Sequence, residues 1–167
     1  MYYGSTHNMG DAAKEYKLMP DHDILEYRPG KYLSASGVLF LWCTSPRMDF
    51  AFQCLENWEL HYRGIAFVWI KTRKLAPLVP IGAQGVRPSI VKPLTEFVIA
   101  ASRIAKGRPM PLGSESVAQT VFAPKGKHSE KPEEIQNRIE LLYPGARKLE
   151  LFARRHRPGW TCRGDEL

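Results

Sequence analysis

Three short apolar runs, each bounded by turn-forming or polar residues, constrain the fold of this chain more than any other feature. They cover Gly37–Trp42, Ile65–Ile70 and Glu96–Ala101. Continuous runs of this length are typical of strands that are buried on both faces of a parallel sheet. Helical patterns alternate with them along the chain. The sequence therefore predicts an α/β fold with a mostly parallel sheet.

Helix signals complete this pattern. Ser45-Pro46 predicts a helix start, and Met48, Phe52 and Leu55 follow at the spacing of a core-facing stripe. With the flanking apolar runs, this helix predicts a βαβ unit. The other predicted elements are a helix from residue 20, a short strand over 117–122, a helix from Pro132 with Ile135, Ile139 and Leu142 buried, and a last strand over 148–152.

The length of 167 residues suits one domain, 1–167. No apolar run approaches the roughly 20 residues that span a bilayer, and the N-terminal residues lack a signal-peptide pattern. The three cysteines are too scattered for a disulfide framework or a zinc site. We therefore expect a cytoplasmic protein with no membrane partner and no metal.

Positive charge is concentrated in the second half. The net charge is +7, and residues 86–167 carry 15 Lys and Arg against 9 Asp and Glu. Residues 71–93 alternate basic side chains with Pro and Gly, which predicts a long basic loop. Such a surface is either a phosphate-binding face for nucleic acid or a solvated basic face.

Generic motifs leave the chemistry open. The chain contains neither G-x-G-x-x-G nor G-x-x-x-x-G-K-[ST], and its five histidines show no metal-ligand spacing.

Several blocks in a fixed order are more informative. They are Tyr16-Lys17-Leu18-Met19 with Asp23-Ile24, Leu39-Phe40-Leu41-Trp42, Val68-Trp69-Ile70-Lys71, Glu96, residues 128–134, Glu150-Leu151-Phe152-Ala153-Arg154, and residues 158–166. In this order they resemble the family named after the 70-kDa subunit of the mRNA adenine-N6 methyltransferase. The resemblance implies a Rossmann-like fold and transfer of a methyl group from S-adenosylmethionine to adenine N6. It favours DNA over RNA as the substrate, because short members of this type come from phages and bacteria.

The resemblance also implies a set of cofactor contacts. Lys131 matches a lysine that holds the cofactor carboxylate, and a helix N-terminus suits that anion as well. Arg154 matches an arginine that binds the ribose. The other matching positions are His156, Arg157, Asp165 and Glu166. Arg157 stands where Asn is common and could instead meet nucleic-acid phosphate, and Asp165 also replaces an Asn.

Four further residues are implied on the substrate side. Tyr16 matches a tyrosine beside the target base, where an aromatic ring can stack. Glu96 orients a cofactor or substrate group, or else simply pairs with Arg103 or Lys92. Arg87 and Lys92 border the substrate groove, or else belong to a solvated loop.

The family's Asp-Pro-Pro-Trp segment, which lies just before the residues matching Tyr2-Tyr3-Gly4, does not occur in residues 1–167. It aligns the adenine amine with the cofactor methyl group, so no catalytic residue is assigned. We expect that the chain begins just after this motif, lacks a central strand, self-associates through unpaired sheet edges, and is a poor catalyst alone. The alternatives are a non-catalytic nucleic-acid-binding module and an α/β interaction domain without a cofactor.

Overall fold

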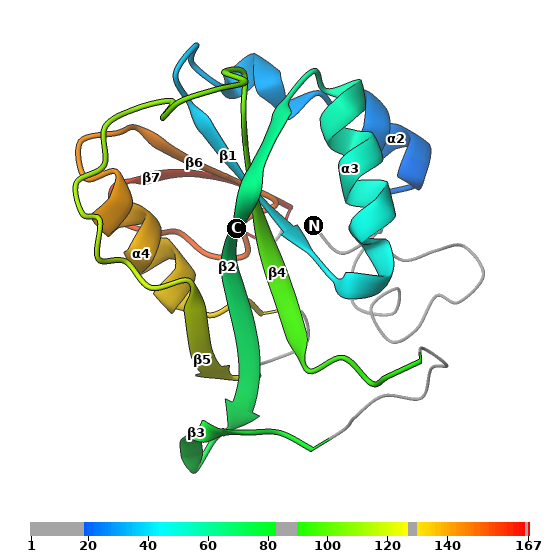
Figure 1. Ribbon diagram of the computed structural model, residues 1–167, viewed down its shortest axis with the longest axis vertical. Helices are drawn as coiled ribbons and strands as arrows, with labels where there is room; N and C mark the ends of the chain where they lie inside the picture. The colour runs from blue at the N-terminus through cyan, green and yellow to red at the C-terminus, as the bar shows by residue number, and fades with distance from the viewer. Residues whose placement is uncertain (1–18, 83–89, 127–129, 166) are drawn as a thin grey trace.

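The computed structural model describes residues 19–82, 90–126, 130–165 and 167 (Figure 1). Its first half contains α2 (Asp21–Glu26), the 3₁₀ helix η1 (Pro29–Tyr32), β1 (Val38–Cys43), the 3₁₀ helix η2 (Ser45–Arg47) and α3 (Met48–Asn57). It continues with β2 (His61–Arg73), β3 (Ala76–Pro80), β4 (Thr95–Ser102) and β5 (Thr120–Pro124). The last elements are α4 (Glu133–Leu142), β6 (Lys148–Leu151) and β7 (Trp160–Arg163). The predicted α/β fold is confirmed.

The strand directions are mixed, which corrects the expectation of a mostly parallel sheet. The main sheet has the order β1-β4-β2-β3, and β5 pairs with β2. β4 is antiparallel to both β1 and β2, and β3 is antiparallel to β2, whereas β5 is parallel to β2. The strands β1, β2 and β5 thus share one direction. β1, α3 and β2 follow the predicted strand-helix-strand order, but β4 separates the two strands.

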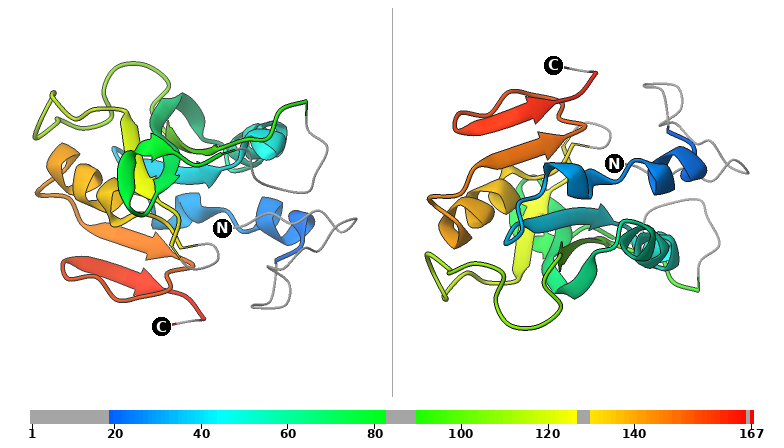
Figure 2. Two further views of the ribbon diagram at one scale, coloured as in Figure 1. Left: turned by 90° about the horizontal axis from the view of Figure 1, so that it is seen from below. Right: turned by 90° about the horizontal axis from the view of Figure 1, so that it is seen from above.

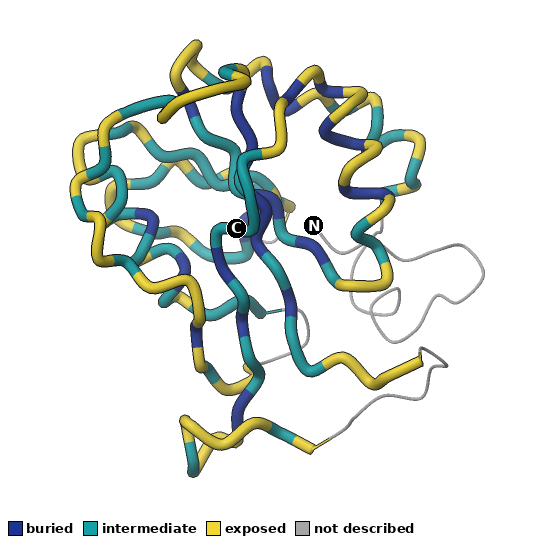
Figure 3. The backbone as a smooth tube through the Cα atoms, in the orientation of Figure 1, coloured by how far each residue is buried: buried dark blue, intermediate teal, exposed yellow. Residues whose placement is uncertain are grey.

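Two apolar layers cover the main sheet, one on each face. Leu41, Cys43, Ile99 and Ala101 face α3 and the α2 segment, and the buried side chains of α3 complete that cluster. Phe67, Trp69, Val98 and Val121 face α4, which contributes Ile135 and Ile139. Alternate residues of one strand point to opposite faces, so β4 supplies both clusters. Figure 1 shows α3 and α4 on opposite sides of the strands, and Figure 3 shows the burial along them.

The buried side of α3 differs from the predicted stripe. Leu55 is buried as expected, but Phe52 is 41% exposed, and Phe50 and Ala51 are buried instead. The buried side is formed by Ala51, Cys54 and Leu55, which recur at i, i+3 and i+4, together with Phe50.

The predicted basic loop over 71–93 is partly regular structure. β2 extends to Arg73 and turns back into β3, whose residues are mostly exposed. This hairpin projects at the lower end of the molecule in Figures 1 and 3. The described remainder, 81–82 and 90–94, contains no helix or strand. The sequence did not predict this hairpin, because basic residues alternate there with Pro and Gly. Pro lacks the N–H that a strand interior needs, so in sheets it occurs mostly in edge strands.

Several strand edges have no partner among the described residues. β1 pairs only with β4, β5 only with β2, and β6 and β7 only with each other. Figure 2 shows the β6–β7 pair at one side of the main sheet, with β7 outermost. β1 has the sequence VLFLWC and contains no charged residue or Pro, so its open edge lacks the usual features that prevent pairing with another strand.

The helices that the structure describes are too short and too polar to cross a membrane.

Candidate functional site

Four charged or aromatic side chains gather where β2 ends, β4 begins and the chain approaches α4. This is also the end of the sheet at which β5 stops (Figure 1). Trp69 of β2 lies opposite Glu96 of β4 in the strand register, and Trp42 of β1 lies opposite Val98. Alternation therefore places Trp42, Trp69, Glu96 and Lys71 on one face. Ligands of α/β proteins bind at the carboxyl ends of strands that share a direction.

Glu96 is the centre of this group, and each of its carboxylate oxygens binds a lysine. Its Oε1 lies 2.8 Å from Nζ of Lys71, and its Oε2 accepts a hydrogen bond from Nζ of Lys131. The Glu96 side chain is only 8% exposed, against 19% for Lys71 and 23% for Lys131. We call these three residues the Glu96 cluster. It joins β2, β4 and the residue before the first turn of α4 through charged contacts.

Both lysines also lie over indole rings. The ammonium of Lys131 lies 5.1 Å from the ring centroid of Trp42, and that of Lys71 lies 5.2 Å from Trp69. The two tryptophans contact each other edge to face, with centroids 6.1 Å apart. Trp69 is fixed further by its Nε1, which donates to the carbonyl of Ala123 at 2.9 Å. Cation–π contacts of desolvated lysines add to the attraction of the carboxylate, so each ammonium is held from two sides.

Burial and charge act in opposite directions on Glu96. Burial alone would raise its pKa, but the positive charges of Lys131 and Lys71 outweigh burial, so the net pKa lies below the ordinary value. The pKa of Lys131 is also lowered, first by burial and then by the nearby charges of Lys71 and Arg154, although Glu96 opposes this. Glu96 is therefore a carboxylate at neutral pH, and Lys131 gives up its proton more readily than a solvated lysine.

Arg154 reaches the same neighbourhood from the loop after β6. Its positive charge is the smallest of the causes that lower the pKa of Lys131. Phe152, two residues earlier, has a φ of +60°, a left-handed turn that is uncommon outside glycine. Ala153 donates its N–H to the carbonyl of Arg163 at 2.9 Å, and a Cβ on Gly164 would lie 2.1 Å from the carbonyl oxygen of Ala153. Glycine at 164 thus allows the close approach of the two backbone segments at Ala153 and Gly164.

Arg157 lies against α4. Its Nε donates to Oε1 of Glu140 at 2.8 Å, and another of its nitrogens donates to Asn137 at 2.6 Å. Nε1 of Trp160 donates to the same Glu140 oxygen at 2.6 Å. We call Arg157, Glu140 and Trp160 the α4 latch, because they tie the turn before β7 to the helix. The predicted contacts of Arg157 with cofactor or phosphate stay predictions, and they require these bonds to rearrange.

The other predicted residues are dispersed. His156 and Asp165 are exposed, and Lys92 is exposed just before β4. Tyr16, Arg87 and Glu166 lie outside the described residues. Of the predicted set, the structure therefore places Lys131 and Glu96 in direct contact.

Sequence reasoning missed the partners of Glu96 and the importance of Lys71. Glu96 was expected to pair with Arg103 or Lys92 if it had only a structural role, but Arg103 donates to the carbonyl of Gly30 at 2.8 Å. Lys71 was placed at the end of one family block and in the basic loop, but no role was assigned to it. The signal was present, since Trp69 and Lys71 are two residues apart in an apolar strand and must share a face. Strand pairing with Glu96 was the missing information.

Comparisons with known proteins show the family to which this chain belongs. The sequence pattern of the MT-A70 family matches residues 6–166. The chain belongs to the MT-A70 family. It is 34% identical over 131 residues to the type II methyltransferase M.MunI of Mycoplasma sp, an alignment that covers 78% of this chain and 50% of that protein.

Eukaryotic relatives are nearly as similar. The chain is 33% identical over 137 residues to the human N(6)-adenosine-methyltransferase catalytic subunit METTL3, covering 81% of this chain and 22% of that protein. An Arabidopsis thaliana N(6)-adenosine-methyltransferase MT-A70-like protein is 32% identical over 137 residues, with 81% and 19% covered. The chain therefore spans half or less of the length of these MT-A70 relatives.

The donor set of the Glu96 cluster fits the cofactor that MT-A70 methyltransferases generally use, S-adenosylmethionine. Two lysines share one carboxylate, so the cluster keeps net positive charge at a largely desolvated position. A carboxylate placed there would compensate that charge, and charge-assisted hydrogen bonds to an ammonium are short and strong.

Proposed function

We propose that this chain binds S-adenosylmethionine and serves methyl transfer to adenine N6 in nucleic acid, with DNA rather than RNA as the substrate. The observation that carries this proposal is the largely buried ammonium of Lys131, which binds the buried carboxylate of Glu96 at the carboxyl ends of strands in a member of the MT-A70 family. A lysine that is largely removed from water and close to two further cations gains most from an anionic ligand.

In this proposal Lys131 binds the cofactor's carboxylate and Arg154 donates to its ribose. His156, Asp165, Arg157 and Glu166 are the further proposed contacts, and Asp165 is suited to accept from ribose hydroxyls. The bound cofactor supplies an electrophilic methyl group carried on a sulfonium. The Glu96 cluster fixes the direction from which the Lys131 ammonium meets the ligand, which is catalysis by positioning.

An exposed basic surface surrounds the same end of the sheet and supports nucleic acid as the partner. We call it the basic rim. Its members follow the end of β2, precede β4 and follow β5, and they are Arg73, Lys74, Lys92 and Lys125. The described segments 71–82, 90–95 and 124–126 contain no Asp or Glu. A surface of one sign suits a phosphate backbone, and Arg87 and Lys92 are proposed to contribute to it.

DNA is favoured because of the resemblance of this short chain to phage and bacterial members. Among the relatives, the alignment covers half of M.MunI but only about a fifth of METTL3. Tyr16 is proposed to stack on the target base. The sequence contains no Asp-Pro-Pro-Trp, so we expect slow methyl transfer by this polypeptide alone.

The open edge of β1 supports the proposal that the chain self-associates. The strand is apolar throughout and pairs on one side only among the described residues. Sedimentation velocity across a concentration series should show a mass that rises above 19 kDa. A monomer at every concentration would contradict this part of the proposal.

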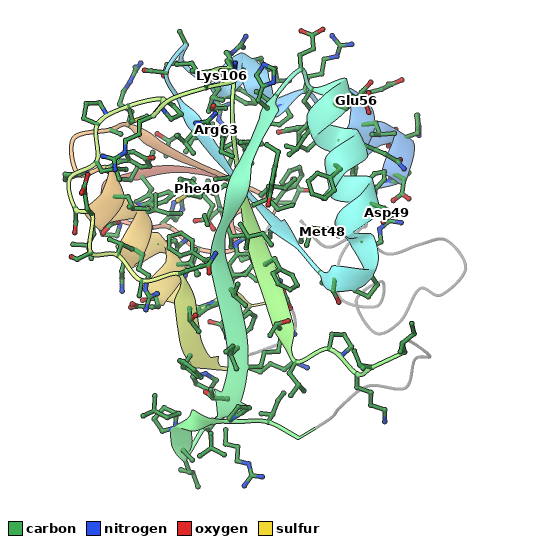
Figure 4. The ribbon with its side chains drawn as sticks, viewed as in Figure 1. Phe40, Met48, Asp49, Glu56, Arg63 and Lys106 are labelled. Atoms are coloured by element: carbon green, nitrogen blue, oxygen red, sulfur yellow. The ribbon has the colours of Figure 1, made fainter. Side chains whose placement is uncertain are left out.

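Nucleic-acid binding is tested with fluorescent DNA and RNA oligonucleotides of one sequence, each containing adenines. A Lys74→Gln, Lys125→Gln variant should weaken binding uniformly across sequences and reduce the salt slope by about 2. Lys106→Gln, an exposed lysine at the opposite end of the sheet (Figure 4), is the matched control. Equal salt slopes for the rim variant and the wild type would contradict the rim assignment.

Methylation of the same oligonucleotides distinguishes the two candidate functions. Cofactor binding with slow transfer to DNA adenine supports the proposed enzyme. Nucleic-acid binding without cofactor binding would favour a non-catalytic binding module. The basic rim by itself would be sufficient for that function. Preferential methylation of RNA would contradict the choice of DNA.

A further inference from the structure

Lys71 has no assigned role in cofactor binding, yet hydrogen bonds and an ion pair fix its position as firmly as that of Lys131, which has such a role. Its backbone N–H donates to the carbonyl of Leu94 at 3.1 Å, and its carbonyl accepts from the N–H of Ile81 at 2.9 Å. The side chain leaves this fixed backbone and reaches Oε1 of Glu96 at 2.8 Å. A lysine in a solvated loop would have neither constraint, so the position of its ammonium is set by the fold.

The two lysines bind Glu96 in the same manner from opposite sides. Each takes one carboxylate oxygen, and each lies over one of the paired tryptophans, Trp42 or Trp69. A carboxylate with both oxygens occupied cannot rotate without breaking a charged contact. Lys71 therefore determines the orientation in which Glu96 presents its other oxygen to Lys131.

This arrangement is poor as a device for stability alone. A carboxylate and one lysine would already be neutral, and a second buried cation adds a desolvation penalty and repulsion. Lys71 indeed contributes to the lowered pKa of Lys131, after burial and against the opposing effect of Glu96. The surplus positive charge is useful only if an anion approaches, because Glu96 then remains bound to Lys71 while Lys131 takes a second acceptor.

We propose that Lys71 is a positioning residue for the cofactor carboxylate, acting through Glu96 on Lys131. The inference deepens the proposed function and rests on it. With Lys71 in place, the negative charge of Glu96 is already neutralised by Lys71 at one oxygen. Glu96 can then share the Lys131 ammonium with the ligand. Without Lys71, the carboxylate is compensated by Lys131 alone, and the ligand must compete with Glu96 for that ammonium.

Calorimetric binding of two ligands tests the inference. S-Adenosylhomocysteine carries the amino-acid carboxylate, whereas 5′-methylthioadenosine keeps the nucleoside and lacks that carboxylate. Lys71→Met should weaken S-adenosylhomocysteine binding about tenfold, the usual size of a lost charged hydrogen bond, and leave 5′-methylthioadenosine binding within about twofold. Lys71→Arg should restore most of the lost affinity for S-adenosylhomocysteine, since it keeps the positive charge. Lys106→Met is the control for removing one lysine.

The outcomes distinguish a failure of the role of Lys71 from a failure of the cofactor site. If Lys71→Met binds S-adenosylhomocysteine as tightly as the wild type, the role of Lys71 is wrong although the cofactor site stands. If both ligands are weakened equally, Lys71 supports the fold and the inference also fails. Absence of binding of either ligand to the folded wild-type chain would overturn the proposed function together with the inference.

Discussion

The Glu96 cluster and the α4 latch are built from the same residue types and behave differently. Each combines a glutamate, basic side chains and tryptophan. In the latch, Glu140 is paired with one arginine at a half-exposed position, and the charges cancel. In the cluster, one buried glutamate serves two lysines, and positive charge remains. The balanced pair therefore ties the turn before β7 to α4, whereas the cluster retains positive charge that an anion would neutralise.

The largest expected effect comes from removing the centre of the cluster. Glu96→Ala leaves two largely buried ammonium groups facing each other, so we expect the free energy of unfolding to fall by about 3 kcal/mol. Urea denaturation measures this. Glu96→Gln keeps the shape and separates the loss of charge from the loss of packing. A change below about 1 kcal/mol, the typical value for a surface pair, would remove the distinction between cluster and latch.

Acid should also affect the cluster. Burial would raise the pKa of Glu96, but Lys131 and Lys71 hold it below its unfolded value. A lowered carboxyl pKa stabilises the protein above the unfolded pKa of about 4.3, and this contribution disappears as the pH falls through the folded pKa. Unfolding free energies measured from about pH 6 to pH 2 should decline less steeply for Glu96→Gln than for the wild type. Identical slopes would show that Glu96 is not linked to the acid transition.

Alkaline pH should act on ligand binding. Burial, followed by the charges of Lys71 and Arg154, lowers the pKa of Lys131 against the effect of Glu96. Glu130 and Arg155 lie nearby in the sequence and pair with each other. Affinity for S-adenosylhomocysteine should therefore decline at a pH below the ordinary lysine value of about 10.4. Glu96→Gln should move this decline to lower pH and Lys71→Met to higher pH. Calorimetric titrations over that range measure the shifts, and unchanged profiles would exclude Lys131 as the titrating group.

The smallest expected effect belongs to the latch. A double-mutant cycle of Arg157→Gln and Glu140→Gln should give a coupling of about 0.5–1 kcal/mol, because the Glu140 side chain is 37% exposed and water screens the pair. Thermal or urea unfolding of the four proteins measures it. A coupling above about 3 kcal/mol would make the latch as important to stability as the cluster. The same Arg157→Gln variant tests its proposed cofactor contact by calorimetry.

The sequence predicted the elements better than their arrangement. Apolar runs located β1, β2 and β4, and Pro132 with Ile135 and Ile139 located α4, because burial on a strand or helix face leaves a local period. The direction of β4 between β1 and β2 leaves no such period. The apolar content of a strand shows that both faces are covered, and it does not show which way the neighbours run.

Part of the site was also predictable from the sequence. Lys131, Arg154 and Glu96 were expected from the order of family blocks, and the structure places Lys131 and Glu96 in contact. Lys71 was missed because its role depends on the register of β2 against β4, a contact between residues 25 positions apart. The partners of Arg157 on α4 were missed likewise, since they depend on how the turn before β7 folds back.

The most direct test of the account is calorimetric binding of S-adenosylmethionine to this chain and to its Lys131→Ala variant. Circular dichroism first confirms that both are folded. We predict that the wild type binds one molecule per chain and that the variant loses at least about tenfold in affinity, as expected for a charged hydrogen bond. Equal binding by the two proteins, or no binding by the folded wild type, would contradict the claim that the Glu96 cluster holds the cofactor.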